Sequence, residues 1–182
     1  NVLSLSLNAI GGNSFLWKQK HNIIHHTYTN IEGVDDDIAQ SKLLRQSPSQ
    51  PWMPIHKYQH LYLTLAYSLS LFMWVSMGDF RKYFSKKIHN TALQRMNRAE
   101  HVTFWLSKLF YVIVYIVVPI LVVGPLAWSI GYVTMGVVTG IVISYTFQLA
   151  HAVEGPEFEA AGIDDKMIET EWAIHQIRTT AN

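Results

Sequence analysis

Hydrophobic residues are concentrated in three long runs after residue 60, at Leu61–Met77, about Phe104–Val123 and about Leu126–Ala150. A helix needs roughly 20 apolar residues to cross a bilayer, so the second and third runs predict membrane-spanning helices. Gly124 and Pro125 stand between them and predict a tight turn. The expected fold is therefore all-α: a membrane-embedded helical hairpin over residues 104–150, with cytoplasmic and interfacial helices around it.

The Leu61–Met77 run is shorter, and hydroxyl-bearing side chains interrupt it. Basic residues flank it on both sides, with Lys57 before it and Arg81 and Lys82 after it. Because basic flanks tend to stay on the cytoplasmic side, we expect a helix that lies in the membrane interface. A buried re-entrant helix is the alternative, and a full span is the least favoured arrangement.

The remaining segments complete one domain over residues 1–182. Residues 1–16 are apolar and predict the end of a transmembrane helix. Residues 17–60 contain a histidine-rich segment and a proline-containing loop, and residues 151–182 predict a cytoplasmic segment. Lys108, near the start of the second run, is expected to extend to the lipid headgroups. The sequence starts inside an apolar stretch and stops without a terminating pattern, so we expect a piece of a longer protein.

Composition narrows the chemistry. Charged residues make up 15% of the chain and the net charge is +1, which gives no basic surface for nucleic acid. The absence of cysteine excludes disulfides and metal–thiolate sites in this chain. Nine histidines remain as an ample supply of imidazole ligands.

Three histidines cluster as His21-x-x-x-His25-His26. On an α-helix with about 100° per residue, His25 lies ~40° round from His21 and His26 ~140° round. This predicts a same-face pair that grips one metal and a divergent third imidazole that points to a neighbouring metal or helix. Chance histidines at a polar helix end are the alternative.

The segment HNIIHHTYTN, preceded by FLWKQK and followed by EGVDDDI, resembles the second histidine box of membrane fatty acid desaturases. The most similar group includes linoleoyl-CoA desaturase-like and front-end acyl desaturases. The later segments FQLAHAVEGPEF and TEWAIHQIRTTAN are similar to the region that leads to the third box. The resemblance therefore covers essentially the whole chain.

The resemblance implies two non-haem irons, O2 as co-substrate and removal of two hydrogens from a fatty acyl-CoA or acyl-lipid chain. It also implies cytochrome b5 or a ferredoxin as electron donor. The protein would be integral to the bacterial inner membrane or the endoplasmic reticulum, with its metal site facing the cytoplasm. The first box, of HDxxH type, is expected before Asn1, and the third, of QxxHH type, after Asn182. The fragment alone is not expected to be active.

The resemblance implies one further ligand, because His175 stands where the family has a single metal-binding histidine. Other candidates come from the residues themselves. Glu171 precedes His175 by one helical turn and is a candidate ligand or supporting carboxylate. His151 ends the third hydrophobic run and is expected to support the site rather than bind metal. Asn30 and Asp35 are expected to orient the box histidines. A hydrogen-bonded interfacial histidine is the alternative for His175, and Asp35–Asp37 otherwise predicts a solvated loop or a helix cap.

Two other functions compete with desaturation. A lipid or alkane hydroxylase or a ketolase of the same superfamily would use the same boxes. A non-catalytic, histidine-rich protein that binds or transports metal is a different class. A transporter should place ionisable residues near the middle of its spans, and the runs from Phe104 to Ala150 contain no acid or histidine there.

Overall fold

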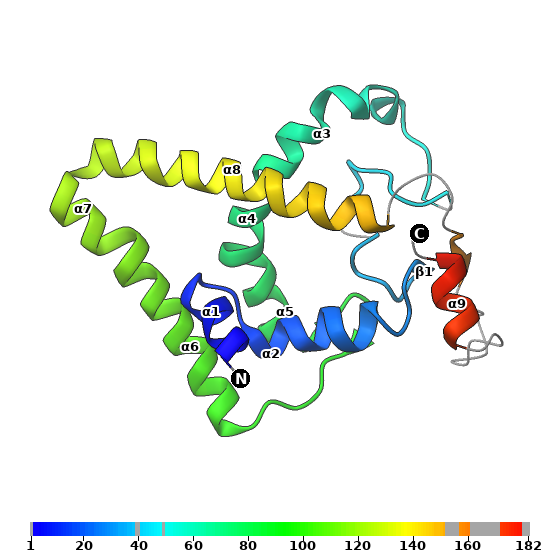
Figure 1. Ribbon diagram of the computed structural model, residues 1–182, viewed down its shortest axis with the longest axis horizontal. Helices are drawn as coiled ribbons and strands as arrows, with labels where there is room; N and C mark the ends of the chain where they lie inside the picture. The colour runs from blue at the N-terminus through cyan, green and yellow to red at the C-terminus, as the bar shows by residue number, and fades with distance from the viewer. Residues whose placement is uncertain (1, 39–40, 49, 152–156, 161–171, 180–182) are drawn as a thin grey trace.

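The computed structural model describes residues 2–38, 41–48, 50–151, 157–160 and 172–179. Two helical arms meet at an angle (Figure 1), the first made of α6 (Arg98–Val112), η4 (Ile113–Val117) and α7 (Val118–Val123), the second of α8 (Pro125–His151). Within them, Arg98–Val123 and Pro125–Leu149 are each long and apolar enough to cross a membrane. The predicted all-α hairpin is confirmed.

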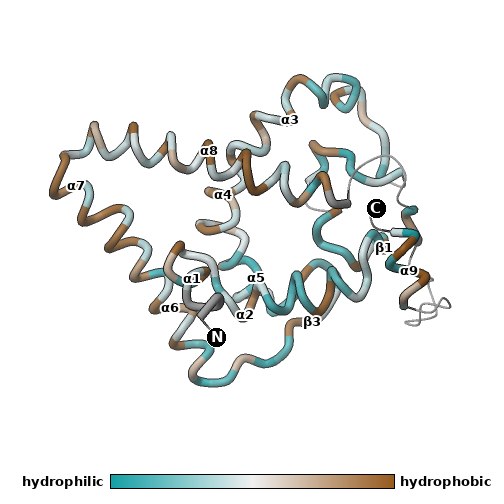
Figure 2. The backbone as a smooth tube through the Cα atoms, viewed as in Figure 1, coloured by the Kyte–Doolittle hydropathy of each residue, from teal (hydrophilic) through white to brown (hydrophobic). Residues whose placement is uncertain are grey.

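Local sequence explains where the arms begin and end. Asn97 caps α6, because its side chain accepts a hydrogen bond from the Glu100 amide while Glu100 accepts one from the Asn97 amide. Gly124 ends the first arm with φ of 82°, and Pro125 begins the second. Hydrophobic residues are dense along both arms, whereas hydrophilic residues gather between α2 and β1 (Figure 2).

A bent helical segment lies between the arms. It consists of η2 (Pro54–Tyr58), α3 (Gln59–Ser68), α4 (Ser70–Met73), η3 (Trp74–Gly78) and α5 (Asp79–Ser85). Its two halves, Pro54–Ser68 and Ser70–Ser85, meet at 57°. The helix expected over Leu61–Met77 is thus interrupted at Leu69. Ser68 contributes to the break, because its hydroxyl donates to the Leu65 carbonyl and competes with the helix for it.

From α3 through α4 the bent segment descends beside α8. Near the open end of the arms, the Thr64 and Tyr145 hydroxyls lie 2.8 Å apart. One turn deeper, the Ser70 hydroxyl donates to the Gly140 carbonyl at 3.1 Å. A Cβ at Gly140 would stand only 2.7 Å from the Tyr67 carbonyl oxygen, so glycine permits this close approach.

From Val75 onward the segment returns beside α6. Lys108 contacts the Val75 carbonyl oxygen at 3.2 Å, the Tyr83 ring stacks on Phe104 at 4.1 Å, and the Tyr83 hydroxyl lies 2.9 Å from His101 Nδ1. These partners run back towards the start of α6. The segment therefore enters and leaves at the open end of the two arms.

Lys108 does not extend outwards, so that prediction is wrong. Its Nζ donates to Asp79 at 2.8 Å, to the Gly11 carbonyl at 2.5 Å and to Val75 at 3.2 Å. The side chain is buried because the returning half of the bent segment brings Asp79 against α6.

The chain begins with α1 (Val2–Ala9), α2 (Ser14–Trp17) and the π-helix η1 (Lys18–His25). Strand β1 (Ile31–Glu32) pairs in parallel with β4 (Glu159–Ala160), and β2 (Lys87–Ile88) pairs antiparallel with β3 (Thr91–Ala92). The short helix α9 (Trp172–Thr179) follows β4. The β1–β4 pair brings the C-terminal segment beside the histidine-rich one, and the sequence pattern predicted neither of these strands.

Candidate metal centre

The three box histidines lie on and directly after η1, whose hydrogen bonds join residues five apart. The His26 amide accordingly donates to the His21 carbonyl at 3.0 Å. The rings of His21 and His25 stack at 5.2 Å, and those of His21 and His26 meet edge-on at 4.6 Å. The α-helical angle expected for His26 is wrong, because a π-helix turns less per residue and keeps the His26 ring beside that of His21. The role of His26 at a neighbouring metal stays a prediction.

His25 is fully buried and held by Asp35. Its Nδ1–H donates to the Asp35 carboxylate, 2.9 Å from Oδ2 and 3.1 Å from Oδ1. Asp35 also accepts from the amides of Asn30 and Asp37, which fixes the carboxylate in place. With Nδ1 protonated, Nε2 of neutral His25 carries the lone pair that a metal would use.

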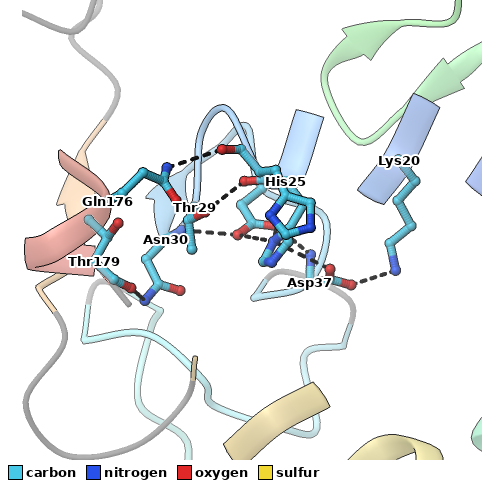
Figure 3. A network of polar contacts seen from close by, with 9 residues as sticks. Lys20, His25, Thr29, Asn30, Asp37, Gln176 and Thr179 are labelled. Atoms are coloured by element: carbon cyan, nitrogen blue, oxygen red, sulfur yellow. Dashed lines mark hydrogen bonds and ion pairs between the residues drawn. The ribbon is translucent and has the colours of Figure 1, made fainter. Parts of the chain in front are cut away.

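The acidic run is not a solvated loop, as one alternative had it. Asp35 and Asp36 are buried, and all three carboxylates are paired. Asp37 Oδ2 also lies 3.4 Å from His25 Nδ1, the same nitrogen that bonds to Asp35. Asp36 pairs with Lys82 at 3.0 Å, and Asp37 pairs with Lys20 at 2.5 Å. Figure 3 shows the Lys20–Asp37 pair beside His25.

His21, His25 and Asp37 form a group of possible metal ligands, with one donor atom from each lying within 4.8 Å of the others. Sequence reasoning missed Asp37 as a donor. The available signal was the position of Asp37 in the acidic run that follows the box. This signal was insufficient, because adjacent side chains of a loop diverge. Only the fold shows that the Asp37 carboxylate turns towards the histidines.

The charges around this group favour neutral imidazole at His21. Burial and the neighbouring His25 and His26 lower the pKa of His21 to about 4. Burial opposes the charged form of His25, but the hydrogen bond and negative charge of Asp35 outweigh it and raise its pKa. For Asp37, burial acts against ionisation, yet Lys20 and His25 prevail and lower its pKa to about 2.

Aromatic rings cover one side of His21. Trp17 stacks on it with 4.6 Å between ring centroids and 26° between the planes. Phe147, from the end of α8, meets it edge-on at 5.5 Å. These contacts restrict rotation of the imidazole and shield this side from water.

The C-terminal helix α9 docks against the same region. The Gln176 side chain donates to the His26 carbonyl at 3.1 Å, and the Asn30 side chain donates to the Thr179 carbonyl at 2.7 Å (Figure 3). His175 is fully buried, whereas the His26 side chain is exposed. Among the described residues, neither belongs to the 4.8 Å donor group.

Two candidate residues cannot be placed in this arrangement. Glu171 lies outside the described residues. His151 is the final residue of α8, and its side chain is likewise outside the described part.

The donor set fits a non-haem iron ion. Imidazole and carboxylate are ligands that suit iron, and a carboxylate-supported imidazole is common in metal sites. A histidine with a pKa of about 4 is neutral at physiological pH, so no proton has to leave before it binds.

Comparison with known proteins identifies the family of the chain. The fatty acid desaturase family model matches residues 1–182. The chain is 37% identical to an sn-1 linoleoyl-lipid 6-desaturase of Arthrospira platensis and 33% identical to one of Synechocystis, in each case over all of this chain and about half of the relative. It is also 29% identical to an acyl-lipid (8-3)-desaturase of Physcomitrium patens, over all of this chain and 38% of that protein. No solved structure matches. The chain spans about half the length of its first two relatives, and it belongs to the fatty acid desaturase family.

Proposed function

We propose that the protein containing this chain is an O2-dependent di-iron desaturase that introduces a double bond into a membrane acyl chain. The observation that carries the proposal is the donor group of His21, His25 and Asp37, with Asp35 fixing His25, in a chain matched along its whole length by the desaturase family. As a fragment, the chain is expected to lack the donors of the first and third boxes and to be inactive alone.

His21 and His25 would hold one iron, with Asp37 as a further donor. His26 and His175 would contribute to a second iron. The docking of α9 supports this assignment, because Gln176, next to His175, is bonded to the backbone of His26. When bound, non-haem iron and O2 supply the oxidising power that an unactivated methylene requires, which zinc lacks.

The residues of this chain prepare the site in three ways. Asp35 keeps the proton of His25 at Nδ1 and leaves Nε2 for the metal. The low pKa of His21 keeps its imidazole available. Trp17 and Phe147 exclude water beside His21 and give that side of the site an apolar surface suited to an acyl chain. His151, Glu171 and Asn30 remain proposed supporting residues.

The names of the relatives favour an acyl lipid over acyl-CoA as the carrier, since they act on linoleoyl-lipid or acyl-lipid substrates. The electron donor would be cytochrome b5 or a ferredoxin.

We further propose that Pro54–Ser85 is a re-entrant segment, in place of the interfacial helix that the sequence favoured. Its contacts support this, because it descends beside α8 and returns beside α6. Only the two arms would then cross the membrane between His21 and His175. Both histidines would face the cytoplasm, whether the membrane is the bacterial inner membrane or the endoplasmic reticulum.

The test uses the full-length protein in membranes with an acyl-lipid substrate and a reducing system. The expected product gains one double bond and loses two hydrogens, and His25→Gln abolishes its formation. An added hydroxyl would instead identify a hydroxylase of the superfamily, and an added carbonyl would identify a ketolase. Protein that is purified with zinc but never with iron would contradict the desaturase and favour a metal-binding or transport role.

A further inference from the structure

A buried ion pair lies between the bent segment and the first arm, apart from the histidines. Asp79 and Lys108 are 2.8 Å apart, with side chains 2% and 7% exposed. Oxygens of Asp79, Gly11 and Val75 satisfy all three donors of the Lys108 ammonium. A buried ion pair is expensive, and a charged residue within a membrane segment generally serves function. The metal site described above makes no use of either residue.

Asp79 also connects the ion pair to the site. Its second oxygen, Oδ1, accepts a hydrogen bond from the Trp74 indole at 3.1 Å. The Trp74 ring lies 5.3 Å from that of Trp17, and Trp17 stacks on His21 at 4.6 Å. An unbroken series of contacts therefore runs from Lys108 to a proposed metal ligand.

We propose that Asp79 is a positioning residue for His21, which it reaches through Trp74 and Trp17. Lys108 balances the charge of the buried Asp79 carboxylate, and the second oxygen of this carboxylate holds the indole N–H. The bonded indole then cannot turn, and it supports Trp17 against the imidazole. The proposal rests on the proposed function only in treating His21 as a ligand.

Simple stabilisation of the fold is the competing role for this ion pair, and two double variants separate the roles. D79N/K108M and D79L/K108M both remove the two charges and leave no isolated buried charge. Only the amide side chain of D79N/K108M keeps an oxygen that can accept from Trp74. A structural role predicts that the two double variants have the same Fe²⁺ affinity and the same reactivity at His21. A positioning role predicts that only D79L/K108M changes these two quantities.

The first measurement is Fe²⁺ affinity of the full-length protein. We expect D79N/K108M to bind Fe²⁺ as the wild type does. D79L/K108M should bind about tenfold more weakly, the lower end of the effect of removing a group that supports a ligand. Trp74→Phe keeps an aromatic ring and the ion pair but removes the N–H, and it should weaken binding in the same direction.

The second measurement needs no metal. Diethyl pyrocarbonate modifies accessible histidines, and peptide mapping gives the rate at His21 in the metal-free full-length protein. This rate should rise in D79L/K108M and in Trp74→Phe and stay unchanged in D79N/K108M. Trp17→Leu is the positive control, because it removes the stacked ring itself.

Equal His21 rates and equal Fe²⁺ affinities in the two double variants would overturn the proposal and leave a structural role. Thermal midpoints show whether each variant folds. If both double variants fail to fold, Trp74→Phe alone tests the proposal, because unchanged Fe²⁺ affinity and an unchanged rate at His21 would contradict it. A wild-type protein that binds no iron would defeat the proposed function, whereas the reaction rate at His21 would still test positioning.

Discussion

Asp35 sets the orientation of His25 and, together with Asp37, its charge. The carboxylate accepts from Nδ1 and contributes to raising the pKa of His25 against the effect of burial. A metal must compete with a proton for Nε2, so metal binding weakens as the pH falls through the pKa of His25. The pH dependence of metal binding should therefore come from His25 and not from His21, whose pKa is about 4.

Asp35→Asn tests this dependence. Without the negative charge the pKa of His25 falls, so the acid loss of Fe²⁺ binding should move to lower pH. At high pH the affinity should drop about 10- to 100-fold, because the orienting carboxylate is gone. A pH series of Fe²⁺ titrations measures both effects. Asp36→Asn is the matched control, since Asp36 pairs with Lys82 and should leave the acid midpoint in place.

The elements show how far the sequence can predict this site. The His21–His26 spacing predicted a ligand cluster, but α-helical geometry gave the wrong angle for His26 because η1 is a π-helix. Asp37 and Asp79 were missed for a common reason. Each acquires its role from a partner that is separated from it along the sequence and lies on another element. The pattern of a single sequence reports only local periodicity. Both arms were predictable, because a membrane span is a local property of about 20 residues.

Docking of α9 can be tested at Asn30, whose φ of 56° lies in the left-handed region. Asn30→Gly keeps this backbone without strain but removes the side-chain hydrogen bond to Thr179. One hydrogen bond contributes about 0.5–1.5 kcal/mol, so amide hydrogen exchange in α9 should accelerate by up to about tenfold. Exchange in α8 should not change. Unaltered exchange in α9 would show that other contacts hold this helix.

Close packing of the bent segment on α8 depends on Gly140. Gly140→Ala would place a methyl group 2.7 Å from the Tyr67 carbonyl oxygen and 2.9 Å from that of Ser68. We expect a loss of about 1–3 kcal/mol in stability, seen as a lower thermal midpoint in detergent. Gly131→Ala, in the same helix with open space around it, should be neutral or slightly stabilising. Equal midpoints for the two variants would contradict the observed helix contact.

The membrane topology of the whole molecule depends on whether Pro54–Ser85 crosses the membrane. This decides whether His21 and His175 lie on the same side of the membrane. The chain has no cysteine, so single cysteines can be introduced at exposed Lys57 and Lys87, on the two flanks, and at Val122 near the tip of the hairpin. In a full-length background freed of other cysteines, a membrane-impermeant maleimide applied to sealed vesicles reports the side of each. A re-entrant segment predicts that positions 57 and 87 react from one side and position 122 from the other. Reaction of 57 and 87 from opposite sides would make the segment a broken span. The histidine box and α9 would then face opposite surfaces, which is incompatible with the hydrogen bonds that join them at Gln176 and Asn30.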